Sequence, residues 1–202
     1  MKSTIQDKAK LVNSVFSRVY DKYDLMNDIM SLGIHRIWKD KFIDWMNPSR
    51  SSTMIDVASG TGDIAKLFSL RVKNLSMVTC IEPNEDMFRK GKNNLINFKN
   101  IKWIKSRAET LPVEDNTYDF YSISYGIRNV SDINKTLKEA YRVLKPGGRF
   151  MCLEFSKIDN EIFDILYQNY SKIIPVIGKY VVGSSKPYDY LIKSIKDFYS
   201  QD

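Results

Sequence analysis

A glycine-rich turn flanked by two acids is the part of the sequence with the clearest capacity for chemistry. Residues 56–63 read Asp-Val-Ala-Ser-Gly-Thr-Gly-Asp, with an apolar run before them and apolar residues at helical spacing behind them. This pattern predicts a strand, a tight turn and a helix. Gly60 and Gly62 allow a close backbone approach, and the free N–H groups at the start of the helix attract anionic or strongly polar ligands. The turn therefore predicts a site for a small charged cofactor.

The acids near the turn distinguish between two classes of cofactor. The spacing Gly-x-Gly-x-x-Ala over residues 60–65 satisfies the permissive dinucleotide fingerprint, and Glu82, about 20 residues on, could accept both hydroxyls of a ribose. NAD and S-adenosylmethionine both fit these features. Asp56 and Asp63 would repel a pyrophosphate, whereas they would stabilise a sulfonium with its free α-amino group. The sequence favours S-adenosylmethionine, and an ordinary turn with solvated acids is the structural alternative.

Composition indicates a globular protein without a membrane span. The chain has 202 residues, of which 43% are hydrophobic and 27% charged, values that suit one domain with a sizeable core. The first ten residues are polar and include Asp7, so they do not look like a signal or transit peptide, and we expect a cytoplasmic protein. Cys80 and Cys152 fall in predicted strands, where we expect buried thiols and no metal site.

The positive charge of the chain bears on its partners. The net charge is +7, but the lysines and arginines are scattered and do not form a stripe with exposed aromatic residues. This pattern argues against nucleic-acid binding. Contact with an anionic membrane surface remains open.

The elements that must position the turn follow from hydrophobic periodicity. Helices are predicted over 12–19, 23–33 and 38–46. Strands then alternate with helices, which predicts an α/β doubly wound parallel sheet, and the predicted strands are 53–58, 75–82, 101–105, 118–124 and 149–155. Residues 145–148, Lys-Pro-Gly-Gly, predict a sharp turn before a last strand that begins at Arg149. Beyond Ser156 an apolar, aromatic segment suggests a lid over a greasy pocket, a surface that touches lipid, or plain core packing.

With these features in place, the chain resembles the ubiquinone/menaquinone biosynthesis C-methyltransferases, class I methyltransferases that act on polyprenylated quinols. The N-terminal stretches and the Arg128 loop are the most specific parts of the resemblance. The stretches that carry it are 22–28, 31–39, 56–63, 125–130, 141–148, 153–156 and 188–191. We therefore expect one domain over 1–202, with a helical substrate cap in 1–50, a cofactor core in 51–156 and the apolar lid in 157–202.

The resemblance also implies particular cofactor contacts and some departures from the family. Contacts to S-adenosylmethionine would come from Thr61, Glu82, the Arg107-Ala108 pair and Ser124, in addition to the acids and glycines of the turn. The family usually has glycine where this chain has Ser59, and aspartate where it has Glu82, so an altered hydrogen-bond geometry is expected there. Members of the family continue past 188–191 with another helix and two strands that this chain is expected to lack.

The reaction that the resemblance implies is methylation of a ring carbon of a quinol. Such a carbon becomes nucleophilic only when a ring hydroxyl loses its proton, so the site needs a base and a group that stabilises the phenolate. The candidates are Asp63, Arg128, Asn129 and His35, although His35 has a structural reading as well. Arg128 stays protonated, so we expect it to orient a water or stabilise the oxyanion.

Other functions and partners remain open at this stage. The chain could be a nicotinamide oxidoreductase built on the same turn, or an inactive, shortened relative that serves as a binding or assembly partner in quinone synthesis. Besides a polyprenyl quinol, possible partners are the inner face of a membrane, a second copy of the chain or a quinone-biosynthesis complex.

Overall fold

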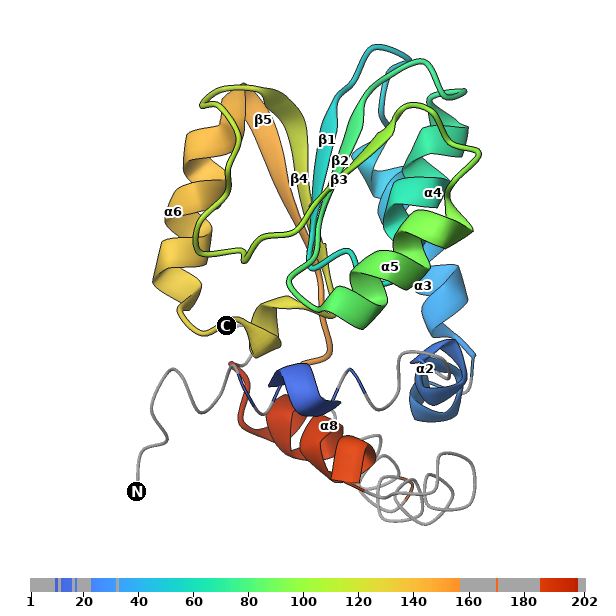
Figure 1. Ribbon diagram of the computed structural model, residues 1–202, viewed down its shortest axis with the longest axis vertical. Coiled ribbons are helices and arrows are strands. Elements are labelled where there is room, and N and C mark those ends of the chain that lie inside the picture. The colour runs from blue at the N-terminus through green and yellow to red at the C-terminus, as the bar shows by residue number, and fades with distance from the viewer. Residues whose placement is uncertain are drawn as a thin grey trace.

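The computed structural model describes residues 10, 12–15, 17, 23–31, 33–156, 170 and 186–199. Its centre is a five-stranded parallel sheet with the order β3-β2-β1-β4-β5 (Figure 1). The predicted α/β doubly wound sheet is thereby confirmed. The strands are β1 (Met54–Val57), β2 (Val78–Ile81), β3 (Ile101–Ile104), β4 (Tyr118–Ser124) and β5 (Leu144–Leu153).

Helices cover both faces of the sheet, with α3, α4 and α5 on one side and α6 on the other (Figure 1). The helix α8 lies below the carboxyl ends of the strands, beside the short 3-10 helix η2 (Figure 1). The helices are α2 (Tyr23–Ser31), α3 (His35–Met46), α4 (Asp63–Arg71), α5 (Glu85–Asn94), η2 (Ile127–Asn129), α6 (Ile133–Val143) and α8 (Lys186–Lys196).

Local sequence explains where several helices begin and end. The Asn84 side chain accepts hydrogen bonds from the N–H groups of Asp86 and Met87 and so caps α5, and Asp132 caps α6 through the N–H of Lys135. The helix α3 ends at Met46, and the next residue, Asn47, caps it in a left-handed conformation before proline. These caps lie where polar residues precede or follow the periodic apolar runs.

Two strand boundaries differ from the prediction. β2 begins at Val78, three residues later than its apolar run, because Lys73 and Asn74 have positive φ and the turn that they form extends to Leu75. β5 begins at Leu144, so the Lys-Pro-Gly-Gly stretch interrupts a strand and does not precede one. Leu144 pairs with Tyr118 and the ladder resumes at Arg149 opposite Phe120, with the turn bulging out between them.

The two cysteines differ in burial. Cys80 on β2 is buried as predicted, whereas Cys152 on β5 is exposed, contrary to the prediction. The reason is the position of the strand, because β5 pairs with β4 on one side only in the part of the chain described. Most of the expected lid, residues 157–169 and 171–185, lies outside the described residues.

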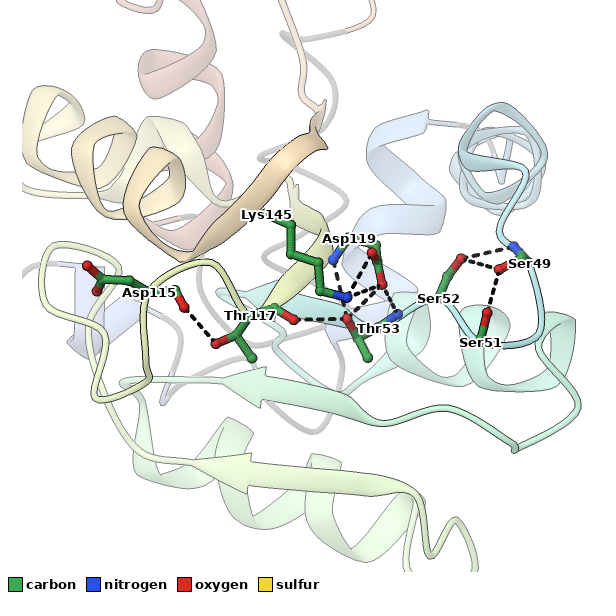
Figure 2. A network of polar contacts seen from close by, with 8 residues as sticks. All are labelled: Ser49, Ser51, Ser52, Thr53, Asp115, Thr117, Asp119 and Lys145. Carbon is green, nitrogen blue, oxygen red and sulfur yellow. Dashed lines mark hydrogen bonds and ion pairs between the residues drawn. The ribbon is translucent and has the colours of Figure 1, made fainter.

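A polar network ties β1 to β4 and β5 at the amino ends of the strands (Figure 2). The Asp119 carboxylate accepts hydrogen bonds from the Thr53 N–H at 2.7 Å and hydroxyl at 2.9 Å, and from Lys145 Nζ at 2.9 Å. Burial acts to raise the pKa of Asp119, but the hydrogen bonds from Thr53 and Lys145 outweigh it and lower the pKa. Lys145, on the bulge, is thus held at the edge of the sheet away from the carboxyl ends.

We predict that Asp119→Asn lowers the free energy of unfolding by about 1–2 kcal/mol, because a partly exposed charge-assisted hydrogen bond is lost. The lowered pKa means that this contribution is complete above about pH 4 and disappears as the pH falls through the folded-state pKa. Urea unfolding at pH 7 and pH 3 measures both effects. Asp115→Asn, at an exposed ion pair with Arg142, is the control and should change stability by less than about 0.5 kcal/mol. Equal losses in the two variants would contradict the assignment.

Candidate functional site

Two adjoining cavities open at the carboxyl edge of the sheet, where open parallel sheets bind their ligands. The larger encloses about 790 Å³ and the smaller about 340 Å³, both including space open to solvent. Ala58, Gly60, Ser124 and Tyr125 line both of them. Among the cofactor residues expected from the sequence, those that line one or both cavities are Asp56, Gly60, Thr61, Glu82, Arg107, Ala108 and Ser124.

Glycine is favoured at positions 60 and 62 of the turn for two different structural reasons. Gly60 has a φ of +56°, and a Cβ there would meet nothing within 4 Å, so its backbone faces open space. Gly62 has a φ of +90°, and a Cβ there would lie 2.6 Å from Leu95 Cδ1 and 3.1 Å from the Trp103 ring. Gly60 therefore leaves room for a ligand, whereas Gly62 is required by packing and lines neither cavity.

Ser59 has a clear structural role at the position where the family usually has glycine. Its hydroxyl donates to the Asp56 carbonyl at 2.6 Å, and its N–H donates to the Ile81 carbonyl at 3.1 Å. These bonds join the turn to the ends of β1 and β2. The hydrogen bond of the Ser59 side chain fixes the conformation of the turn, which a glycine at this position would leave more flexible.

Glu82 connects the glycine turn to the start of α5. One carboxylate oxygen accepts the Gly60 N–H at 2.8 Å and the other accepts the Asn84 N–H at 2.9 Å. Burial raises the pKa of Glu82 to about 7, although both hydrogen bonds act to lower it. Carboxylate oxygens have further lone pairs, so Glu82 retains acceptor capacity for hydroxyl groups in the larger cavity.

Asp56 presents an unpaired carboxylate oxygen to the smaller cavity. Its side chain is 1% exposed, and Oδ1 accepts the Ser122 hydroxyl at 2.7 Å, while Oδ2 has no partner among the described residues. Burial, with added repulsion from Asp63 and Glu82, raises the pKa of Asp56 to about 7. The Ser124 hydroxyl, which lines both cavities, is also buried without a partner in that set. These groups need a donor from a ligand, as a free α-amino group would provide.

An ion pair that the sequence did not reveal lies at the smaller cavity. Asp63, the first residue of α4, accepts a hydrogen bond from Lys39 Nζ at 2.5 Å. Lys39 comes from α3 and is 7% exposed, whereas the Asp63 side chain is 42% exposed. The Asp63 carboxylate, which was expected to act as a base, is therefore paired with a cation.

A second ion pair lies beyond β4, at the candidate catalytic loop. Arg128 and Glu154 are both buried and form an ion pair, and the Arg128 guanidinium lies 5.6 Å from the centre of the Phe155 ring. The side-chain oxygen of Asn129 accepts the Tyr190 hydroxyl at 2.9 Å, and Asn129 also lines the larger cavity. Asn129 thus lines the larger cavity, whereas Arg128 lines neither cavity and directly precedes Asn129. Their partners come from the residue after β5 and from α8.

Sequence reasoning missed Lys39, Glu154 and Tyr190. Glu154 directly follows the last strand, at the same edge as the acids that were identified, so that rule could have found it. Lys39 carried no such signal, since it lies on a helix that precedes the sheet.

His35 lies away from the candidate chemistry. The Ser31 hydroxyl donates to the Asn27 carbonyl at 2.8 Å, and so it accepts from His35 Nδ1 at 2.9 Å. Burial, together with the charge of Lys39, lowers the pKa of His35. The described residues that line the two cavities do not include His35. In this structure its contacts join α2 to α3.

The comparisons with known proteins agree with this geometry. The model of the ubiE/COQ5 methyltransferase family matches residues 2–202. The chain belongs to this family. The chain is also 52% identical over 204 residues to the ubiquinone/menaquinone biosynthesis C-methyltransferase UbiE of Rickettsia bellii (strain OSU 85-389), which covers 97% of this chain and 82% of that relative. It is 51% identical over 203 residues to the protein of the same name from Rickettsia prowazekii (strain Madrid E), covering 96% and 81%.

Solved structures confirm the fold of the methyltransferase. A SAM dependent methyltransferase from Aquifex aeolicus matches with a TM-score of 0.50 and 27% identity over 55% of this chain and 60% of that chain. A SAM-dependent methyltransferase from Thermotoga maritima matches with a TM-score of 0.58 and 22% identity over 81% and 70%. The predicted resemblance, including the class I methyltransferase fold, is therefore confirmed.

The raised pKa of Asp56 predicts a pH-dependent affinity. A cationic ligand binds the ionised carboxylate, so affinity for S-adenosylmethionine should rise between about pH 6 and pH 8, by up to about tenfold per pH unit below the pKa. The ligand-free protein should conversely lose stability from about pH 4 to about pH 7, because unfolding allows Asp56 to ionise. Calorimetric titration across this range measures the first effect, and thermal unfolding the second.

Methylthioadenosine is the matched control, because it lacks the amino-acid part but keeps the ribose that Glu82 is expected to bind. Its profile should be flatter than that of S-adenosylmethionine, and Asp56→Asn should make the two profiles similar. Identical profiles in the unmodified protein would contradict the role of Asp56.

Proposed function

We propose that the chain is an S-adenosylmethionine-dependent C-methyltransferase that methylates a ring carbon of a polyprenylated quinol in ubiquinone or menaquinone synthesis. The observation that carries this proposal is the position of the Arg128 loop. Asn129 lines the same cavity as Glu82 and Ser124, and Arg128 precedes it in a buried ion pair with Glu154. A cation that can stabilise a phenolate is thereby held next to the cofactor groups.

The residues at the cofactor cavities fit the donor. The unpaired oxygen of Asp56 accepts from the α-amino group, and Glu82 accepts from the ribose hydroxyls. When bound, S-adenosylmethionine supplies an electrophilic methyl group. Gly60 keeps the backbone clear for it, since a Cβ there would point into open space.

Aromatic side chains beside the Arg128 loop support a planar acceptor. The Tyr125 and Phe155 rings stack with their centres 4.8 Å apart, and Trp38 packs edge-on against Phe155 at 6.1 Å. A quinol ring would bind against such a surface by stacking and burial of apolar area. This group of Trp38, Tyr125 and Phe155 is the aromatic wall of the proposed acceptor site.

The polar groups beside the aromatic wall have different roles in activating the ring. Arg128 keeps its proton at ordinary pH, so it stabilises the negative charge that develops on the ring oxygen. Glu154 holds the guanidinium in place, and Tyr190 holds the Asn129 amide. The proton of the ring hydroxyl passes to a water that Arg128 and Asn129 orient, because Asp63 is paired with Lys39 and the contacts of His35 join α2 to α3. After methylation the proton of the ring carbon returns through the same water to the ring oxygen, which restores the aromatic ring and its hydroxyl.

Exposed apolar residues near this wall support binding of a prenyl tail and contact with a membrane surface. The start of α3 and the turn before it expose Ile34, Ile37 and Trp38, at 43%, 59% and 40%. In the described part of the chain, no helix has the length and apolar character needed to cross a bilayer. The α2–α3 region thus acts as the substrate cap, and β5, paired on one side in that part, supports contact with another subunit.

The central test is methyl transfer to a quinol. Protein is incubated with methyl-labelled S-adenosylmethionine and a demethylated prenyl benzoquinol or naphthoquinol, and label in the ring is expected with at least one of them. The absence of label with both rings, in folded protein that binds the donor, would overturn the proposal. NAD is included in the binding titrations, since tight binding of NAD would favour an oxidoreductase.

Loss of the Arg128 charge should slow turnover while the donor still binds. Arg128→Met alone leaves Glu154 buried and unpaired, so the test variant is Arg128→Met with Glu154→Gln. We expect turnover to fall by about 10²–10³-fold, with donor affinity changed by less than about threefold. Arg89→Met on the exposed face of α5 is the control. Unchanged turnover in the double variant would remove Arg128 from the mechanism.

The apolar surface of α3 should act on the tail of the substrate and not on its ring. Ile37→Ser is expected to raise KM about five- to tenfold for a long-chain prenyl quinol, since about one buried aliphatic side chain is lost, and to leave KM for a short-chain analogue unchanged. Leu75→Ser, at an apolar residue that is 68% exposed and lies near the amino ends of the strands, is the control. Equal effects on both substrates would contradict a tail contact.

A further inference from the structure

We infer that Lys39 is a cofactor-binding residue, and that its ammonium group binds the carboxylate of the methionine moiety of S-adenosylmethionine. The inference concerns the donor alone and does not depend on the identity of the acceptor. It assigns a ligand contact to a residue of α3, outside the strand ends that supply the other proposed contacts.

The ion pair with Asp63 does not by itself explain why Lys39 is buried. Its side chain is 8% exposed in the pair, against 42% for Asp63. Removing an ammonium group from water costs free energy, and a pair with a well-hydrated carboxylate gives little in return. Asp28 and Asp56 also lie within range of the Lys39 charge, but no hydrogen bond joins either of them to Lys39 in the described part of the chain. The burial of Lys39 is therefore better explained by a ligand anion that accepts its remaining donors.

Lys39 also retains hydrogen-bonding capacity. An ammonium group has three N–H donors. Within the described residues one of them is used, by Asp63 at 2.5 Å. The others are available to a ligand in the smaller cavity, which Lys39 lines together with Asp56 and Thr61.

The same cavity is complementary to an amino-acid zwitterion. Asp56 presents a buried, unpaired carboxylate oxygen that suits an ammonium group. Lys39 presents the opposite charge, and the N-terminus of α4, which has no side-chain cap, adds a partial positive charge. A ligand that has an amino group and a carboxylate on one carbon satisfies both ends. The adenosine part of such a ligand would extend toward Glu82 in the adjoining larger cavity, through the residues shared by the two.

The test compares ligands with and without the carboxylate. Affinities for S-adenosylmethionine, S-adenosylhomocysteine and decarboxylated S-adenosylmethionine are measured by calorimetry in the absence of any quinol, so failure of quinol methylation would leave this result unaffected. The unmodified protein should bind the decarboxylated compound about 10- to 100-fold more weakly than S-adenosylmethionine, the effect of one charge-assisted hydrogen bond. Equal binding would overturn the inference without any variant.

Substitution of Lys39 then locates the effect. Lys39→Met should weaken binding of both carboxylate ligands about 10- to 100-fold and leave binding of the decarboxylated compound within twofold. Lys41→Met, at an exposed lysine of the same helix, should change none of the affinities. Lys39→Met with Asp63→Asn controls for the released Asp63 charge, and Lys39→Arg is used if removal of the charge prevents folding. An equal loss for all ligands would show a structural role and overturn the inference.

Discussion

The burial of acidic side chains at the carboxyl edge of the sheet is the constraint on which the rest of the site depends. Asp56 and Glu82 are almost fully removed from water, and burial raises the pKa of each to about 7. Such groups reduce the stability of the ligand-free protein, because a carboxylate loses its hydration on folding. Their cost is offset when a ligand brings donors and positive charge. The buried carboxylates therefore favour a cationic cofactor over a pyrophosphate.

Two ion pairs accompany these acids, one at the proposed donor side of the site and one at the proposed acceptor side. Lys39 and Asp63 lie at the smaller cavity, and Arg128 and Glu154 lie beyond β4 beside the aromatic wall. Each pair joins two segments that are distant in sequence. The position of each charged side chain is therefore fixed by a partner from another part of the fold. The charge of Lys39 also acts to lower the pKa of Asp56, which opposes the repulsion between Asp56 and the neighbouring carboxylates.

Whether the sequence predicts an element boundary or the burial of a residue correctly depends on whether the physical cause is local in the sequence. β4 has its predicted bounds because a polar turn over 115–117 precedes it and Tyr125, which has a positive φ, ends it, and α5 and α6 begin at asparagine and aspartate caps. β2 starts late because turn residues with positive φ extend into its apolar run. The exposure of Cys152 also escaped prediction, since it depends on which strand lies at the edge and not on the composition of β5.

The sequence by itself determined the glycine turn, the alternation of strands and helices, and the acids at the strand ends, because these depend on short-range spacing and on the rule that ligands bind at the carboxyl edge. Only the tertiary structure decided which groups meet there. Lys39 reaches Asp63 across 24 positions, and Arg128 meets Glu154 across 26. Such contacts result from the packing of α3 and the order of the strands. The turn therefore specified a charged cofactor, and packing specified the cations that accompany it.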